Sequence, residues 1–118
     1  MADPSPDPEC LFCRIVAGDV PATLVRQTDR VVAFRDIDPK APTHVLVVPR
    51  AHHAAVADLA AADPQALAEL VTEAAALAAD DGHSDFRLVF NTGAGAGQSV
   101  FHVHAHVLAG RQLAWPPG

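Results

Sequence analysis

Three histidines alternate with small apolar residues near the end of the 118-residue chain, in the segment His102-Val103-His104-Ala105-His106-Val107. Residues two apart in a β-strand point to the same face of the sheet. We therefore expect a strand running to about Leu108, with three imidazoles on one face and the apolar side chains packed inward. Such a row offers groups that can each act as nucleophile, proton carrier or ligand near neutral pH.

Two other interpretations of the histidine row remain open. The three side chains could be incidental polar groups on a solvent-facing strand. They could also share a metal ion, although no carboxylate lies within the strand to complete or orient such a site.

Apolar runs and turn residues elsewhere predict the remainder of the fold. The apolar run Val45 to Val48 is typical of a central strand buried on both faces. Asp63-Pro64 opens a long helix that ends at Gly82, and a short helix of about two turns ends at Gly18. Further short strands are expected at 23–27, 31–34 and 86–90. We predict an α+β fold with about five mainly antiparallel strands, one long helix and one short helix.

Length and charge limit the domain organisation and the partners. The chain predicts one domain at 10–118, preceded by a flexible, Pro-rich tail at 1–9. The net charge is −6 and Lys40 is the sole lysine, so we expect no nucleic-acid surface. The opening residues are acidic and the apolar runs are short, which predicts no secretion signal and no membrane association. A cytoplasmic protein is expected.

A loop rich in glycine, Asn91 to Ser99, directly precedes the histidine row. Small residues let backbone N–H groups approach an anion, and Gly97 and Ser99 can direct donors at phosphate oxygens. Cys10 and Cys13 have a spacing typical of metal or redox sites, and supply half of a zinc site. Two idle cytosolic thiols are the alternative.

The segment Gly97 to Leu108 resembles the signature of the histidine triad (HIT) family, in which three histidines alternate with apolar residues. The ending Gly110-Arg111-Gln112 followed by Trp115-Pro116-Pro117-Gly118 is similar to the Hint-like branch, the purine nucleoside phosphoramidases. The resemblance extends through Asp36-Ile37 and Ala41-Pro42-Thr43-His44, and covers nearly the whole chain from about Cys10. It implies a HIT domain at 10–118.

The resemblance implies a nucleotide-binding hydrolase that cleaves the P–N bond of purine nucleoside phosphoramidates, such as AMP-amine or AMP-lysine adducts. A nucleotidylated histidine would be the intermediate, and a nucleoside monophosphate of the AMP or GMP type would be released. A dinucleoside polyphosphate hydrolase of the same fold is the alternative enzyme. A nucleotide-binding regulatory module with vestigial catalysis is the alternative outside enzymes.

Site residues follow from the same resemblance. His104 would be the nucleophile, His106 would stabilise the phosphoryl oxygens, Ser99 would assist the leaving amine, and His102 completes the triad. The carboxylate of Asp36 can accept hydrogen bonds from both ribose hydroxyls, although it could also serve only to form a turn. The remaining substrate contacts implied are Ile37, Phe12 and Phe34 for the base, Gly97 and Gln98 for the phosphate, and Asn91 and His44 as further polar members. Ordinary core packing is the alternative for the three apolar residues.

Relatives of this kind also imply a metal site and a dimer. The chemistry needs no cofactor, but a structural zinc would be held by Cys10, Cys13, His52 and His102, with His53 competing with His52. A homodimer is expected, with the C-terminal segment around Trp115 crossing its interface. Ala105 and Ala114 depart from the family pattern and could alter the leaving-group preference.

Overall fold

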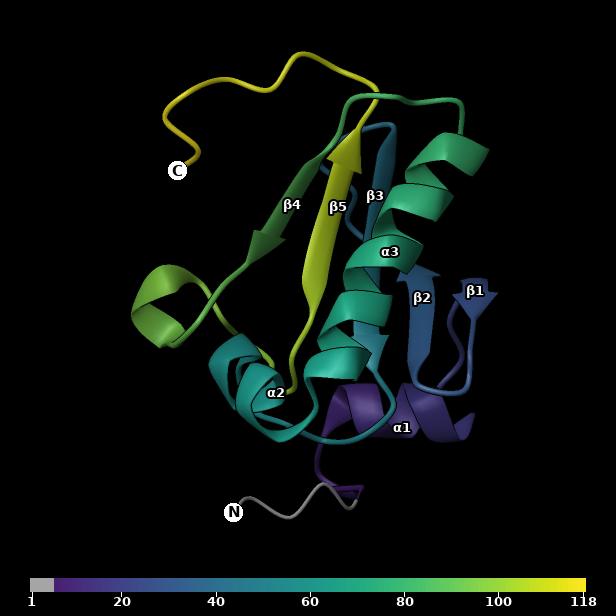
Figure 1. The fold of residues 1–118 in the computed structure, drawn as a ribbon, viewed down its shortest axis with the longest axis vertical. Coiled ribbons are helices and arrows are strands. Elements are labelled where there is room, and N and C mark those ends of the chain that lie inside the picture. Colours follow the sequence, from purple (N-terminus) through teal and green to yellow (C-terminus); the bar gives the residue numbers. More distant parts are fainter. Residues whose placement is uncertain (1–5) are drawn as a thin grey trace.

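A computed structural model describes residues 6–118 and contains one five-stranded sheet (Figure 1). The spatial order is β1-β2-β3-β5-β4, and every neighbouring pair is antiparallel. The strands are β1 (Leu24–Gln27), β2 (Val31–Arg35), β3 (Thr43–Pro49), β4 (Arg87–Phe90) and β5 (Ala105–Ala109). The predicted sheet and its buried central strand are confirmed, since every residue of β3 is buried.

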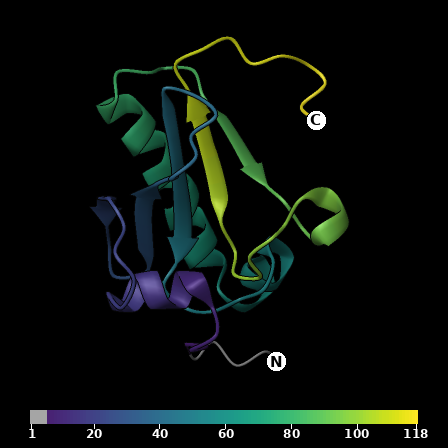
Figure 2. The same ribbon diagram turned by 180° about the vertical axis from the view of Figure 1, so that it is seen from behind.

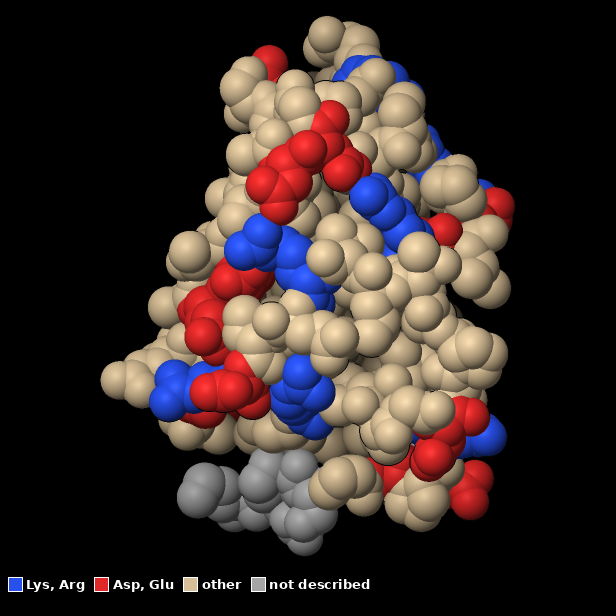
Figure 3. All heavy atoms as spheres, turned by 90° about the vertical axis from the view of Figure 1, so that its right-hand side faces the viewer, with Lys and Arg blue, Asp and Glu red and all other residues tan. Residues whose placement is uncertain are grey.

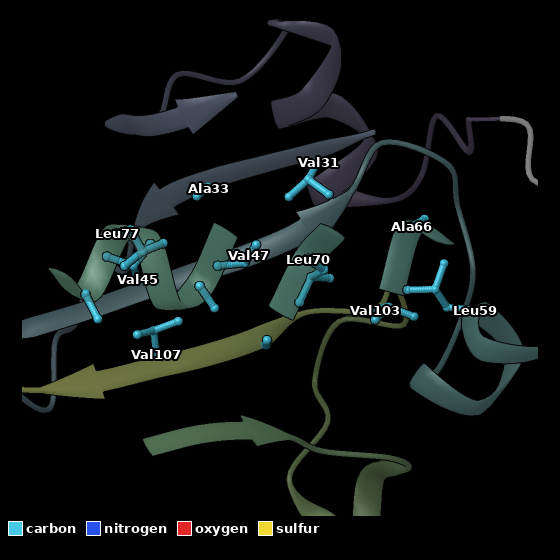
Figure 4. Close-up of a cluster of buried hydrophobic side chains, with 13 residues drawn as sticks. Val31, Ala33, Val45, Val47, Leu59, Ala66, Leu70, Leu77, Val103 and Val107 are labelled. Atoms are coloured by element: carbon cyan, nitrogen blue, oxygen red, sulfur yellow. The ribbon is translucent and has the colours of Figure 1, made fainter. Parts of the chain in front are cut away.

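Helix α3 (Pro64–Asp80) covers one face of the sheet and forms the main core (Figure 4). The Asp63 carboxylate accepts a hydrogen bond from the Ala66 N–H at 3.1 Å, so the predicted N-cap is confirmed. Leu70 and Leu77 are fully buried against Val45 and Val47 of β3. The alternation of strand side chains therefore sends β3 residues 45 and 47 toward α3, and residues 44, 46 and 48 toward the opposite face.

Helix α1 (Leu11–Ala17) lies across one end of that opposite face (Figure 2). It ends where predicted, at Gly18, whose φ of 85° is the left-handed conformation that glycine adopts at helix ends. Phe12 and Cys13 pack there against Phe34 of β2 and Val48 of β3. This second cluster leaves the other end of the face, around His44 and His106, uncovered by a helix.

Two short helical elements were not predicted. The helix α2 (Val56–Ala62) precedes α3, and a 3₁₀ turn η1 (Ala94–Ala96) interrupts the glycine-rich loop. The predicted long and short helices are both present, as α3 and α1, and α2 is a third α-helix among the described residues. No side chain at Ala55 can cap α2; instead the Asp58 carboxylate accepts from the Ala55 N–H at 3.2 Å. The alanine-rich sequence also offers only Leu59 as a fully buried anchor.

The predicted tail at 1–9 is described only in part, because residues 1–5 lie outside the described residues. Nearer the domain, the Cys10 N–H donates to the Asp7 carbonyl at 3.0 Å and forms a turn that leads into α1. Among residues 6–118, no helix has the length and apolar character needed to cross a bilayer.

Ion pairs tie β1 and β2 to α3 and to the residue that follows it. Arg26 of β1 pairs with Glu73 and with Asp80, and Arg35 of β2 pairs with Asp81. The Arg35 guanidinium and the Thr43 hydroxyl, which donate to the Asp81 carboxylate, lower the pKa of Asp81 to about 2. Acidic and basic groups accordingly alternate on the face that carries β1 and α3 (Figure 3). Because Arg35 and Thr43 precede Asp36 and His44, this network also fixes one edge of the candidate site.

Candidate active site

The histidine row does not lie wholly within a strand. Strand β5 begins at Ala105, so His106 is in the strand while His102 and His104 precede it. The prediction of three histidines in one strand is therefore wrong. Pro49 of the neighbouring strand has no N–H to donate, and its carbonyl lies 2.8 Å from the His102 ring Nε2, so the ladder ends here. The alternation survives, because Val103, Ala105 and Val107 are all buried in the core under α3.

His104 is held in one tautomer by the backbone of His102. Its Nδ1 lies 2.9 Å from the His102 carbonyl oxygen, and a carbonyl can only accept, so Nδ1 carries the proton. The lone pair is then on Nε2. The ring is buried, and Phe12 packs edge-on against it with centroids 5.0 Å apart. Tautomer and ring orientation are thus both fixed before any ligand arrives.

His44 and His106 form a hydrogen-bonded pair whose proton positions follow from one backbone donor. The Lys40 N–H donates to His44 Nδ1 at 3.0 Å, so a neutral His44 carries its proton on Nε2. His44 Nε2 lies 2.9 Å from His106 Nδ1 and donates to it, which leaves the His106 proton on Nε2. Burial lowers the pKa of both His44 and His106, which favours these neutral forms. His106 therefore presents an N–H donor, and its ring centroid is 5.2 Å from that of His104.

A cleft of about 670 Å³ opens beside this pair. Asp36, His44, Asn91 and His106 line it, together with the C-terminal segment, including Ala114 and Pro116. Asp36 Oδ2 is 3.4 Å from His44 Nε2, while its Oδ1 accepts from the Asp38 N–H at 2.8 Å and forms the turn that was the alternative interpretation. The neighbouring Ile37 side chain is fully exposed, although it is apolar.

The glycine-rich loop approaches the triad differently from the prediction. The amide of Gln98 is buried and bound to backbone: its Oε1 accepts from the Gly93 N–H and its Nε2 donates to the Ala54 carbonyl. In this structure Gln98 braces the loop, and its contact with phosphate stays a prediction. Gly97 has a φ of 98°, a conformation that side-chain-bearing residues rarely adopt. Ser99 is exposed and lines a second groove of about 460 Å³, with His52 and Phe101.

Phe12 and Phe34 lie inside the second hydrophobic cluster. They are 5% and 3% exposed, and their rings meet edge-on with centroids 5.5 Å apart. This is the core packing that was the alternative to base binding. Their contact with a base stays a prediction, and neither residue lines the cleft.

Four predicted metal ligands converge at the buried end of α1. The Cys10 and Cys13 sulfurs and the Nδ1 atoms of His52 and His102 all lie within 4.8 Å of one another. Cys13 Sγ is 3.2 Å from His52 Nδ1, and the two Nδ1 atoms are 3.3 Å apart. Zinc bonds of about 2.3 Å to sulfur and 2.0–2.1 Å to nitrogen place tetrahedral ligand atoms roughly 3.3–3.8 Å apart. Donor set and spacing thus fit a structural zinc.

The same geometry favours His52 over His53 as the fourth member of the cluster. His52 joins the cluster, while His53 is buried elsewhere and its Nδ1 has no hydrogen-bond partner among the described residues. Burial lowers the pKa of His102 to about 4, so its ring is neutral. Its Nε2–H donates to the Pro49 carbonyl, which turns the Nδ1 lone pair toward the sulfurs, an orientation that metal-binding histidines commonly have.

The sequence model of the protein family described as HIT domain matches residues 17–113 of the chain. The chain belongs to the histidine triad (HIT) family. A crystal structure of a HIT family hydrolase from Legionella pneumophila superimposes with a TM-score of 0.89 at 47% identity, covering 93% of this chain and 100% of that one. The purine nucleoside phosphoramidase of Escherichia coli is 42% identical over 89% of this chain and 90% of its own length. A 14 kDa zinc-binding protein from Zea mays is 40% identical over 95% of this chain and 90% of its own length.

Several groups of this HIT domain site were not found from the sequence. The Lys40 N–H and the Pro49 carbonyl set ring tautomers through backbone atoms, which leave no signal in residue identity. Arg87 and Arg111 also line the cleft; the Arg87 guanidinium donates to the Ala114 carbonyl at 2.8 Å. Their positions depend on where the C-terminal segment folds back, which local sequence patterns do not reveal.

Proposed function

We propose that this protein hydrolyses the P–N bond of purine nucleoside phosphoramidates and releases a nucleoside monophosphate. The supporting observation is the tautomer of His104, whose Nε2 lone pair is free while Nδ1–H is bound to the His102 carbonyl. A neutral imidazole with a free lone pair is a nucleophile, and nucleophilic catalysis divides one difficult displacement into two easier ones.

Two in-line displacements make up the proposed reaction. His104 Nε2 attacks phosphorus and the P–N bond breaks, with its electron pair going to the amine nitrogen, which takes a proton from solvent with the help of Ser99. Water then attacks the nucleotidylated His104, frees the imidazole and releases the nucleoside monophosphate and a proton. The His106 Nε2–H donates to the phosphoryl oxygens as charge develops on them. Asp36 accepts from the ribose hydroxyls, and Asn91 and Gly97 contact the phosphate.

Substrate choice separates this proposal from a dinucleoside polyphosphate hydrolase. We expect kcat/KM for an adenosine phosphoramidate to exceed that for a diadenosine polyphosphate by at least about a hundredfold, or about 2.7 kcal/mol of transition-state discrimination. The name of the E. coli relative supports this order. Both substrates are assayed by release of AMP under the same conditions. A higher kcat/KM for the polyphosphate would contradict the proposed substrate class, and turnover of neither would favour a regulatory nucleotide-binding module.

We also propose a structural zinc at Cys10, Cys13, His52 and His102. In that role zinc supplies no step of the reaction and cross-links α1 to the segment that carries His102. The fit of the donor set supports it, as does the name of the maize relative.

A homodimer is the proposed assembly. Trp115 in the C-terminal segment is 81% exposed, so its side chain is accessible for contact with a partner. Sedimentation at micromolar concentration is expected to show a species of twice the 12.3 kDa chain mass. A monomer throughout the micromolar range would contradict the proposed dimer.

A further inference from the structure

We infer that the cysteine–histidine cluster, once metal is bound, positions the nucleophile His104 as well as stabilising the fold. The inference rests on His104 being the nucleophile of the proposed function. His102 is one of the four ligands, and Phe12 lies between Cys10 and Cys13 in the sequence. Both residues contact His104 directly. The cluster is thus joined to the reacting ring by two separate routes.

The first route runs through His102. This residue is fully buried, and its Nδ1 lies 3.5 Å from the sulfur of Cys10 and 3.5 Å from that of Cys13. Its Nε2 is bound to the Pro49 carbonyl, so both ring nitrogens are fixed at once. The backbone carbonyl of the same residue accepts the His104 Nδ1–H at 2.9 Å. A shift of the His102 ring therefore moves the group that selects the His104 tautomer.

The second route runs through Phe12, which lies between the two cysteines in the sequence. Because Cys10 is the N-cap of α1 and Cys13 lies in its first turn, a metal that fixes both sulfurs also fixes the start of this helix. The Phe12 ring packs edge-on against His104, at 5.0 Å between centroids, and against His102, at 6.1 Å. Loosening of α1 would remove the wall that holds the nucleophile ring.

The four ligands constrain one another far less without a metal. Because the Nε2–H is bound to the Pro49 carbonyl, a His102 ring with one proton accepts hydrogen bonds at Nδ1. The two thiols and His52 can then share their protons with it in more than one hydrogen-bonding arrangement. A tetrahedral ion allows a single arrangement of all four atoms. Metal occupancy should therefore decide how narrowly the His104 ring is held.

The variant His52→Ala separates this effect from direct contacts. His52 is bound to the cluster through Nδ1, whereas the His104 contacts described above come from His102, Phe12 and His106. The variant is compared with wild-type protein that has been stripped by a chelator and then reloaded with zinc chloride. Val48→Ala is the matched control, because Val48 is fully buried in the same apolar cluster and its truncation removes no ligand atom.

Two readouts are measured at one fixed pH near neutrality. In protein with ¹⁵N-labelled histidine, the His104 Nδ1–H signal is expected to be slow to exchange in the zinc-loaded wild type. It should broaden or vanish in stripped protein and in His52→Ala, and return on zinc addition to wild type only. We expect kcat for the phosphoramidate to fall about tenfold or more in parallel, with AMP affinity changed little, as for other outer-shell partners of a reacting group.

Each outcome bears on the inference. Val48→Ala should lower stability yet keep both the Nδ1–H signal and kcat, and equal losses in this control would overturn the inference in favour of general loosening. An unchanged signal and kcat in stripped protein would show the cluster to be structural only and would also overturn it. Failure of wild type to take up zinc would do the same. Absence of any phosphoramidate turnover, with a zinc-dependent Nδ1–H signal, would refute the proposed function while supporting the positioning effect.

Discussion

Replacement of His104 by alanine is expected to lower kcat for an adenosine phosphoramidate by a factor on the order of 10⁴ or more, as for the loss of other enzyme nucleophiles. The expectation depends on the His104 tautomer, in which Nδ1–H is bound to the His102 carbonyl and Nε2 keeps its lone pair. Neither neighbour can substitute, because His102 faces the cysteines and the His106 Nδ1 is occupied by His44. Steady-state release of the amine measures the loss.

Two controls keep this result interpretable. His83→Ala removes a histidine in the loop after α3, outside the cleft, and should leave kcat within about twofold of wild type, as surface substitutions usually do. AMP binding by calorimetry should persist in His104→Ala, because the ribose and phosphate contacts remain. Equal rates for wild type and His104→Ala would exclude His104 as the nucleophile.

The second large effect is expected at His106. Replacement by alanine removes the Nε2–H donor aimed at the phosphoryl oxygens, and loss of one such donor typically costs about 10²–10³ in kcat. Because charge on those oxygens grows toward the transition state, kcat should fall more than AMP affinity does. The measurement is kcat by amine release, paired with AMP binding by calorimetry.

Replacement of His44 tests why His106 presents a hydrogen-bond donor to the cleft. His44→Leu removes the group that donates to His106 Nδ1, but leaves the His106 ring in place, free to adopt either tautomer. We expect a fall of about tenfold or less, smaller than for His106→Ala, because one tautomer still presents the donor. A larger loss in His44→Leu than in His106→Ala would contradict the proposed order of proton positions along Lys40, His44 and His106.

The sheet and the long helix could be predicted because their signals are local and strong. The apolar run Val45 to Val48 and the Asp63-Pro64 start of α3 each specify an element by themselves. Helix α2 could not be predicted in this way, because alanine-rich segments lack a distinctive apolar stripe. The N-terminus of α2 also has no capping side chain. Its position depends on Leu59 reaching the core.

The residue types of the candidate site could be predicted from the sequence better than their arrangement in space. The alternation of His102, His104 and His106 predicted a shared direction, but the end of the β3–β5 ladder at Ala105 depends on Pro49, which lies on another strand. Likewise, the sequence predicted His52 as a ligand with His53 as a competitor, and the path of the chain before α2 brings only His52 to the cysteines. Partners far apart in the sequence decide both points.

The backbone segment 102–106 contributes side chains both to the cysteine–histidine cluster and to the cleft. His102 faces the metal ligands and His106 faces the cleft, while His104 lies between them with its tautomer set by the His102 carbonyl. Such a layout links the stability of the α1 end of the molecule to the chemistry at the cleft.

Covalent capture of the nucleotide tests His104 most directly. Wild-type protein is mixed with excess adenosine phosphoramidate, quenched within milliseconds under alkaline conditions that preserve phosphorylated imidazole, and analysed by peptide mass spectrometry. We predict one adenylyl group, located on His104, in wild type and none in His104→Ala. An adenylyl group on another residue, or turnover with no adenylated protein at any quench time, would contradict nucleophilic attack by His104.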